Sequence, residues 1–318
     1  MLRLCTINNR ILTPQYLPKV IRKQLITEAK WVDAYEPEHE ERELLQTFLR
    51  TELPDSTEVE EIEASARYFV DSFGIHIHSL FLGQKEGRSQ TVSVAFILHA
   101  DRLITLRKNL ELADFRLLRM RARKKRIEVA NPRELLLTIF EQKVENLADT
   151  IEDIFGRLGH VSYQVLEEEG ADNEDSIDQL AKLEDTNGKI RLCLMDTQRS
   201  LAFLLRQMRG QPECQETIHD MMRDIDTLLS HTAFLFEKIN FLMDAALGFI
   251  NIEQNQIIKT FSIAAVVFMP PTLIASIYGM NFEYMPELKW LLGYPGALVL
   301  MVLSGIAPYW FFKRKGWL

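Results

Sequence analysis

Two stretches near the C-terminus contain no charged residue. They cover residues 260–282 and 290–312, each is 23 residues long, and seven residues separate them. A helix needs about 20 mostly apolar residues to cross the hydrocarbon core of a bilayer. The pattern therefore predicts two transmembrane helices joined by a short loop. The alternative is a pair of buried core helices in a soluble protein, which the length of both stretches disfavours.

The first of these stretches continues a long helical pattern. Residues 213–269 contain no proline and a single glycine, Gly248, and apolar residues recur there at helical spacing. A continuous helix over residues 213–278 would be roughly 100 Å long at 1.5 Å per residue. A lone helix of that length is not expected to be stable, so we expect it to pack against partners that include copies of the same chain.

Further upstream the pattern predicts a helical hairpin. The sequence Asn131-Pro132-Arg133-Glu134 predicts the start of a helix. Asparagine is a favoured N-cap residue, proline is tolerated in the first turn, and a glutamate three residues after the cap can complete a capping box. The first helix is expected to reach about residue 167 and the second to cover 176–208. The turn between them is rich in acidic residues: Glu167, Glu168, Glu169, Asp172, Glu174, Asp175 and Asp178.

The N-terminal part resembles a compact α/β domain. Apolar runs predict strands at residues 2–7, 31–34, 67–70, 75–81, 91–98 and 102–105, with helices at 37–48 and 112–124. His76 and His78 share one face of a strand and could bind a metal, but an ordinary surface strand is the simpler interpretation. The basic run 116–126 is expected to be a solvated helix face, or to pair with the acidic hairpin turn of a neighbouring chain.

These patterns divide the chain into seven parts. They are a cytoplasmic α/β domain (1–130), a helical hairpin (131–212), a stalk helix (213–259), a first transmembrane helix (260–281), an outer loop (282–289), a second transmembrane helix (290–312) and a basic tail (313–318). The overall class is an α+β membrane protein.

Charge sets the expected orientation. Lys313, Arg314 and Lys315 follow the second apolar stretch directly, as is typical of the cytoplasmic side of a membrane helix. Both termini are therefore expected in the cytoplasm, and no signal peptide is apparent at the N-terminus. The net charge is −8, which disfavours nucleic acid as a partner. Cys5, Cys193 and Cys214 show neither metal-ligand spacing nor a pairing pattern and fit a reducing compartment.

One stripe of the first membrane helix is polar or small. Its members lie three, four or seven residues apart, at the spacing of one helix face: Asn255, Ser262, Ala265, Met269, Thr272 and Ser276. Such residues mark contacts between membrane helices, or they line a narrow pore, and one helix can do both. Because a single hairpin cannot enclose a water-filled path, a pore would require several copies around a symmetry axis.

The end of this helix carries the sequence Gly279-Met280-Asn281, followed by Met285-Pro286-Glu287-Leu288. This combination, directly after the first of two C-terminal spans, resembles the CorA family of magnesium/cobalt transporters. The resemblance implies a funnel-shaped homopentamer in the inner (plasma) membrane of a bacterium. It also implies that Gly279, Met280 and Asn281 form the outer selectivity site. Asn255, Met269 and Thr272 match pore positions of the family. Ile258 and Phe261 lie at its gate positions, where relatives carry other apolar residues, and this departure is expected to preserve a hydrophobic gate.

The chemistry of these residues suits hydrated Mg²⁺. Mg²⁺ releases its water reluctantly, so an entry site should offer amides and carbonyls, which Asn281 and Gly279 can supply. Glu283 and Glu287, repeated around a ring, would concentrate cations by electrostatic attraction, although a solvated loop face is the other interpretation. The resemblance further implies closure by intracellular Mg²⁺ at acidic stalk positions, for which Asp220 and Asp244 are the candidates; either could also be an ordinary solvated acid.

Three functions are compatible with the sequence. The preferred one is potential-driven influx of Mg²⁺, with Co²⁺ and Ni²⁺ as further substrates, where Mg²⁺ is both cargo and regulator and no organic cofactor is needed. The alternatives are a transporter of another metal such as Zn²⁺, and a membrane-anchored scaffold whose hairpin is only a tether. No catalytic set has a recognisable motif, so an enzyme is not expected.

Overall fold

A computed structural model describes residues 1–15, 23–49, 67–107, 110–168, 172–281, 283 and 285–317. The chain forms two compact units, Met1–Met243 and Asp244–Leu318, and helix α7 (Pro212–Tyr278) contributes to both.

The first unit contains a seven-stranded sheet with the order β2-β1-β3-β7-β6-β5-β4. The strands are β1 (Leu2–Asn8), β2 (Ile11–Pro14), β3 (Trp31–Tyr35), β4 (Tyr68–Val70), β5 (Ile75–Lys85), β6 (Arg88–Leu98) and β7 (Leu103–Arg107). Among the described strands, only β3 and β7 pair in parallel. All six predicted strands are present, and the four-residue strand β2 was not predicted.

The β5–β6 hairpin extends further than its apolar residues predicted. Its two-residue turn is Glu86-Gly87, and both residues have positive φ, 53° and 77°. A turn of this kind matches the right-handed twist of the two strands. The pairing therefore continues through polar residues to Lys85 and Arg88, because the turn rather than hydrophobicity fixes the register there.

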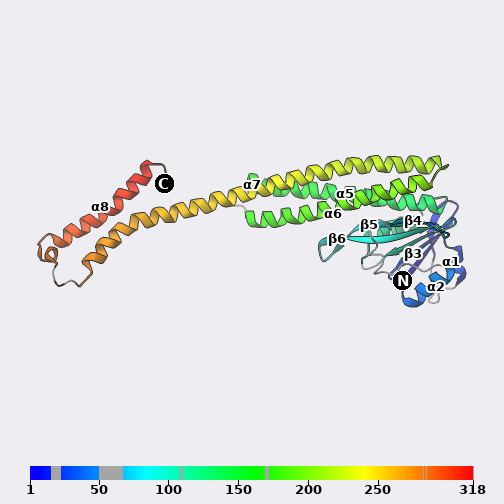
Figure 1. The fold of residues 1–318 in the computed structure, drawn as a ribbon, viewed down its shortest axis with the longest axis horizontal. Helices are drawn as coiled ribbons and strands as arrows, with labels where there is room; N and C mark the ends of the chain where they lie inside the picture. The colour runs from blue at the N-terminus through cyan, green and yellow to red at the C-terminus, as the bar shows by residue number, and fades with distance from the viewer. Residues whose placement is uncertain are drawn as a thin grey trace. The chain divides into compact units, whose positions relative to one another are not determined.

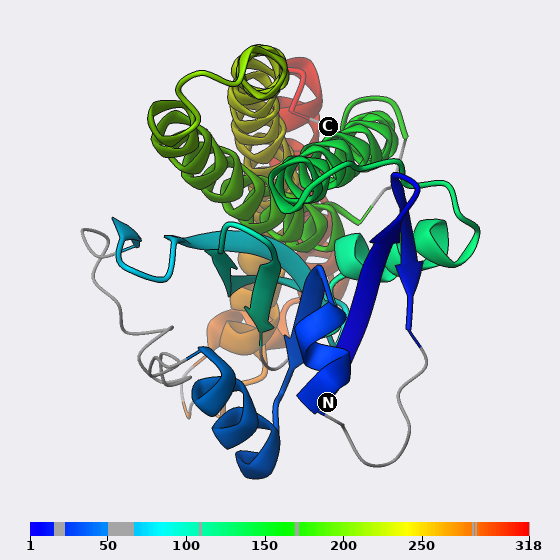
Figure 2. The same cartoon turned by 90° about the vertical axis from the view of Figure 1, so that its right-hand side faces the viewer.

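Helices cover both faces of the sheet (Figure 2). On one face, α1 (Lys23–Glu28) and α2 (His39–Leu49) place Ile26 and Leu45 in an apolar cluster with Val32, Ala95 and Ile104. The other face packs against α4 (Ala113–Arg123), α5 (Pro132–Leu166) and α6 (Asn173–Gln207). Strand residues alternate between the two faces, as the two-residue period of a strand requires.

The start of α5 has the predicted cap. The Asn131 side chain accepts hydrogen bonds from the backbone N–H groups of Arg133 and Glu134, each at 3.0 Å, and Pro132 is in the first turn. Glu134 in turn accepts from the Asn131 side chain at 2.7 Å. The second hairpin helix begins earlier than predicted, at Asn173, because Asp172 caps it in the same manner.

A buried polar centre joins the hairpin to the sheet. The Asp196 carboxylate on α6 accepts hydrogen bonds from the Ser79 hydroxyl and the Leu80 N–H of β5, both at 2.7 Å. Lys143 on α5 is buried and donates to the same Ser79 hydroxyl at 2.8 Å, while its ammonium lies 4.4 Å from the centre of the Phe81 ring. Because buried charges are stable only when paired and hydrogen-bonded, this centre fixes α5 and α6 against β5.

The first part of α7 runs alongside α5 and α6 (Figure 1). The Asn187 side chain on α6 donates to the Thr232 carbonyl at 2.9 Å, and the Gln198 side chain donates to Asp226 at 2.7 Å. The rings of Phe155 and Phe234 stack at 6.4 Å. The predicted long helix is thus partly covered within its own chain.

The second unit contains the two apolar helices. Helix α7 ends at Tyr278, three residues before the predicted end of the first span, and α8 covers Gly293–Arg314 rather than 290–312. The later start of α8 has a local cause, because residues Pro286–Lys289 form a 3₁₀ turn, η1, that precedes it. The apolar part of each helix is almost entirely exposed in the single chain. A helix pair buried in the core of a soluble protein would be covered, so this exposure disfavours that alternative.

Two interpretations of polar residues in the first unit were wrong. His76 and His78 are buried rather than on a surface strand; His76 stacks on Phe69 at 4.3 Å and its Nε2 lies 3.0 Å from Asp71. Burial lowers the pKa of His78 to about 4. The basic run 116–126 is not uniformly solvated, because Arg119 turns into the protein toward Asp33.

Candidate metal-ion site

The end of α7 presents the predicted entry motif to solvent. The Gly279 N–H donates to the Ala275 carbonyl at 2.9 Å, and a Cβ atom at position 279 would lie only 3.1 Å from that oxygen. Glycine therefore allows the chain to leave the helix in a tight turn. Met280 is half exposed and Asn281 is exposed. The amide of Asn281 is thus available to a hydrated ion.

The loop that follows is anchored by its backbone. The Trp290 N–H donates to the Glu287 carbonyl at 3.3 Å, and the Gly293 N–H donates to the Trp290 carbonyl at 3.0 Å. A Cβ atom at position 293 would lie 2.2 Å from the Glu287 carbonyl oxygen, so only glycine fits there. Glu283 is exposed and Glu287 is partly exposed, which leaves both carboxylates able to act on nearby ions.

The predicted stripe lies on one face of α7, and this face is turned away from α8. All eight candidate pore residues are exposed in the single chain: Asn255, Ile258, Phe261, Ser262, Ala265, Met269, Thr272 and Ser276. The opposite face of α7 approaches α8, where Val267 and Pro271 border a shared apolar groove with Gly305. Within this unit, α8 covers one side of α7 and leaves the stripe free.

Two adjacent prolines lie within α7, at positions 270 and 271. A proline lacks the N–H that would bond to the carbonyl four residues earlier, so the carbonyls of Val266 and Val267 lose their helical partners. The hydroxyl of Thr272 donates to the Phe268 carbonyl at 2.7 Å in the same turn. Freed carbonyls are tolerated at membrane depth where another helix or water satisfies them. The Val267 carbonyl lies on the side of α7 that approaches α8, not on the stripe that contains Met269 and Thr272.

Asp220 lies in an acidic hollow between α5 and α7. The hollow has a volume of about 350 Å³, and its lining includes Glu141, Glu145, Asp220 and Asp224. Partial burial raises the pKa of Glu141, and the charge of Glu145 raises it further. Asp220 also pairs with Arg223 at 3.4 Å. The carboxylates repel one another here, so a cation in the hollow would lower their electrostatic energy.

Asp244 does not share this hollow. It is exposed on α7, where the second unit begins. Among the described residues, no three His, Cys, Asp or Glu side chains converge closely enough to hold a metal ion directly. An ion near Asp220 would therefore keep its water shell or take ligands from a second copy of the chain. The sequence pattern gave no sign that Glu141 and Glu145 would face Asp220, because they are distant in the chain.

Comparisons with known proteins decide the family. The profile described as "CorA-like Mg2+ transporter protein" matches residues 27–314. The chain belongs to this CorA-like family. The proteins named "Magnesium transport protein CorA" from Pectobacterium atrosepticum and Escherichia coli K12 are 52% and 51% identical to it. The alignments cover 92% and 94% of this chain and 93% and 95% of those proteins.

Two solved full-length structures have a fold similar to that of this chain. The complete CorA magnesium transporter from Methanocaldococcus jannaschii matches with a TM-score of 0.75 at 20% identity, covering 100% of this chain and 99% of that one. The full-length CmaX protein matches with a TM-score of 0.70 at 17% identity, covering 98% and 97%. These likenesses confirm the predicted fold class of an α/β domain, a long helix and two C-terminal apolar helices. Members of the CorA-like family are ion transporters, so the expectation that this chain is not an enzyme is confirmed as well.

Proposed function

We propose that this chain transports Mg²⁺ across the bacterial inner membrane. The observation that carries the proposal is the identity of 51–52%, over more than nine tenths of the chain, to proteins named as magnesium transporters. The Gly279-Met280-Asn281 motif at the end of α7 supports it. It offers a backbone carbonyl and an amide to the water shell of an ion that is slow to dehydrate.

Transport requires several copies of the chain, and we propose a funnel-shaped homopentamer. The exposed stripe from Asn255 to Ser276 would line the pore, with Ile258, Phe261 and Met269 as apolar constrictions that close by excluding water. The uncovered face of α7 in the single chain supports this assignment. Both termini would lie in the cytoplasm, with Glu283 and Glu287 at the outer mouth.

The membrane potential is sufficient to drive influx. A divalent ion that moves inward through 100 mV gains roughly 4.6 kcal/mol, at about 2.3 kcal/mol per charge. Closure at high intracellular Mg²⁺ would act through Asp220, for which the acidic hollow with Glu141, Glu145 and Asp224 is the supporting observation. Asp244 is a second candidate. Co²⁺ and Ni²⁺ are proposed as further substrates because they also bind amide and water ligands in six-coordinate geometry.

The test is Mg²⁺ uptake into proteoliposomes that contain a Mg²⁺ dye. Wild-type protein should show uptake that depends on the membrane potential, and Asn281→Ala should abolish it. Asn8→Ala, an exposed asparagine in the first unit, is the matched control and should transport normally. Equal uptake by wild type and Asn281→Ala would remove Asn281 from the entry site.

The same assay separates the alternatives. Uptake of Zn²⁺ in preference to Mg²⁺ would favour the other-metal alternative. A correctly oriented protein that moves no metal under any gradient would favour the scaffold.

A further inference from the structure

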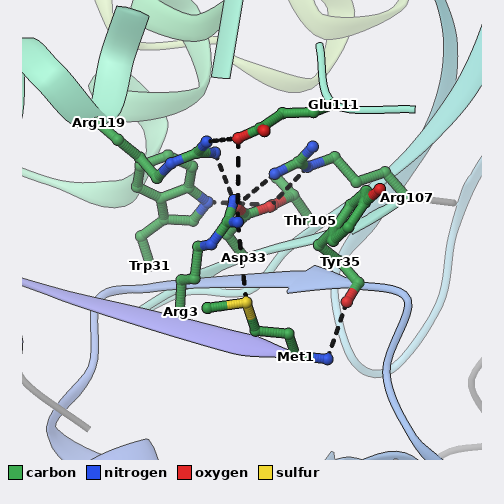
Figure 3. A network of polar contacts seen from close by, with 9 residues as sticks. All are labelled: Met1, Arg3, Trp31, Asp33, Tyr35, Thr105, Arg107, Glu111 and Arg119. Carbon is green, nitrogen blue, oxygen red and sulfur yellow. Dashed lines mark hydrogen bonds and ion pairs between the residues drawn. The ribbon is translucent and has the colours of Figure 1, made fainter. Parts of the chain in front are cut away.

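Asp33 in the first unit is surrounded by three arginines from three different elements (Figure 3). Arg107 of β7 donates to both carboxylate oxygens, at 3.0 Å from Nε and 2.9 Å from Nη2. The Nη1 atoms of Arg3 on β1 and Arg119 on α4 lie 3.8 and 3.6 Å from Asp33 Oδ2. The sheet register places Arg3 directly opposite Asp33, so the fold itself brings these charges together.

The cluster carries more positive than negative charge. Asp33 is buried and Glu111 is the second acid; the Glu111 carboxylate contacts Nη2 of Arg119 and lies 4.0 Å from Nη2 of Arg3. Three guanidinium groups therefore face two carboxylates. Burial lowers the pKa of Arg119, and the charge of Arg3 lowers it further. The charge of Arg107 lowers the pKa of Arg119 as well, whereas Asp33 and Glu111 oppose this shift.

Hydrogen-bond donors are left over as well. The Nη1 atoms of Arg3, Arg107 and Arg119 are all buried without a hydrogen-bond partner. Nearly all buried polar groups in native proteins have a partner, and an orphaned group often marks a bound ion or water. The orphaned atoms of Arg3 and Arg119 lie near the same Asp33 oxygen, so one ligand could reach the two side chains that carry them.

Glu111 differs from the rest of the cluster. Its side chain is 51% exposed, whereas those of Arg107, Arg119 and Arg3 are 0%, 14% and 23% exposed. A half-exposed carboxylate bound by guanidinium groups occupies the position that a soluble anion would take. It can leave this position by rotating into solvent, and a salt bridge that is this exposed on one side costs little to break.

We propose that Arg3 and Arg119, supported by Arg107, form a binding site for a phosphate-type oxyanion that replaces the Glu111 carboxylate. A phosphate dianion brings twice the charge of a carboxylate and an additional acceptor oxygen. Arginine binds such groups through two parallel hydrogen bonds, and the planar guanidinium suits this geometry. Asp33 holds Arg107 in place. Once Glu111 is displaced, the positive charge of the three arginines exceeds the negative charge of Asp33 by an amount that one phosphate dianion can neutralise.

Equilibrium dialysis of radiolabelled inorganic phosphate against the full-length protein in detergent tests this site. Mg²⁺ is left out so that phosphate stays free. Wild type should bind phosphate saturably, and Arg119→Gln should weaken binding about tenfold or more, as expected for loss of a charge-assisted hydrogen bond. Arg123→Gln, which changes an exposed arginine on the same helix, should bind like wild type.

Glu111→Gln provides an independent test, because it leaves all three arginines of the cluster in place. Because it removes the competing carboxylate charge, it should tighten phosphate binding. Unlabelled ADP tests the source of the phosphate group, since displacement at lower concentrations than inorganic phosphate would point to a nucleotide. Absence of saturable binding by wild type, equal binding by Arg119→Gln, or weaker binding by Glu111→Gln would each overturn the proposal.

Discussion

Pro271 of α7 lies against Gly305 of α8. A Cβ atom at position 305 would be 3.3 Å from Pro271 Cγ and 3.6 Å from the Val267 carbonyl oxygen. This carbonyl is the one whose helical partner Pro271 removes, so α8 approaches α7 closely where the helix backbone is irregular. Small residues permit such approaches between membrane helices.

Replacing Gly305 by leucine should separate the two helices. Overpacking of this kind is expected to cost about 1–3 kcal/mol, which should lower the thermal unfolding temperature of the detergent-solubilised protein and reduce uptake. Gly296→Leu on the same helix is the control, because a Cβ atom at position 296 would meet nothing within 4 Å. Equal effects of the two substitutions would contradict a specific contact.

The outer acids should act through long-range attraction rather than by binding ions directly. Replacing both Glu283 and Glu287 by glutamine is expected to lower Mg²⁺ uptake several-fold at low ionic strength, because the ring then attracts fewer cations. The difference should nearly vanish at about 1 M salt, where charges are screened within about 3 Å. A deficit that persists at high salt would instead indicate direct coordination. Glu43→Gln, at an exposed position of α2, controls for loss of surface charge.

Asp220 should contribute to the effect of Mg²⁺ on stability. Mg²⁺ that binds the native state raises the unfolding temperature, and Asp220→Asn should increase the Mg²⁺ concentration required for this about tenfold, because one charged ligand is lost. The same should hold for Glu141→Gln, which shares the hollow. Glu237→Gln, an exposed acid elsewhere on α7, is the matched control. An unchanged Mg²⁺ response in Asp220→Asn would exclude the site.

Asp114 should make the stability of the first unit depend on pH. Its carboxylate is buried, and burial raises its pKa to about 7. The folded state therefore holds a proton that the unfolded state releases above pH 3.8. The contribution of this proton to the free energy of unfolding is complete below that pH and is lost as the pH rises to about 7.

Asp114→Asn removes this dependence. Relative to wild type, its unfolding temperature should rise between about pH 4 and pH 7 and then stay constant. The full effect should be of the order of a few kcal/mol, at about 1.4 kcal/mol per pH unit. Thermal unfolding at a series of pH values measures it, with Asp153→Asn on the exposed side of α5 as control. A difference from wild type that does not change with pH would contradict the assignment.

Short, local signals in the sequence predicted helix starts and strands correctly. The cap of α5 depends on four consecutive residues beginning with Asn131, and the structure confirms it. The strands with strong apolar runs are also present, whereas β2 was missed because only four residues, ending in Pro14, form it. Its pairing with β1 is decided by the neighbouring strand, which no local pattern reveals.

Predictions about the surroundings of charged side chains were wrong or incomplete where the fold brings together residues that are distant in the sequence. Arg119 was expected in solvent, yet it contacts Asp33, which lies 86 residues earlier. Asp220 was identified from its position in the stalk, but its neighbours Glu141 and Glu145 became apparent only in the folded unit. The environment of a charge depends on which elements pack against it, and sequence spacing carries little information on this.

The sequence by itself determined the two membrane stretches, the long helix that leads into the first of them, and the Gly279-Met280-Asn281 motif that places the chain in its family. These features are contiguous in the chain, so the hydrophobic pattern and the order of residues suffice to detect them. Only the tertiary structure decided which face of α7 is left free by α8, which acids surround Asp220, and which arginines gather at Asp33. These relationships arise from packing between elements far apart in sequence, where burial and geometry rather than residue type set the outcome.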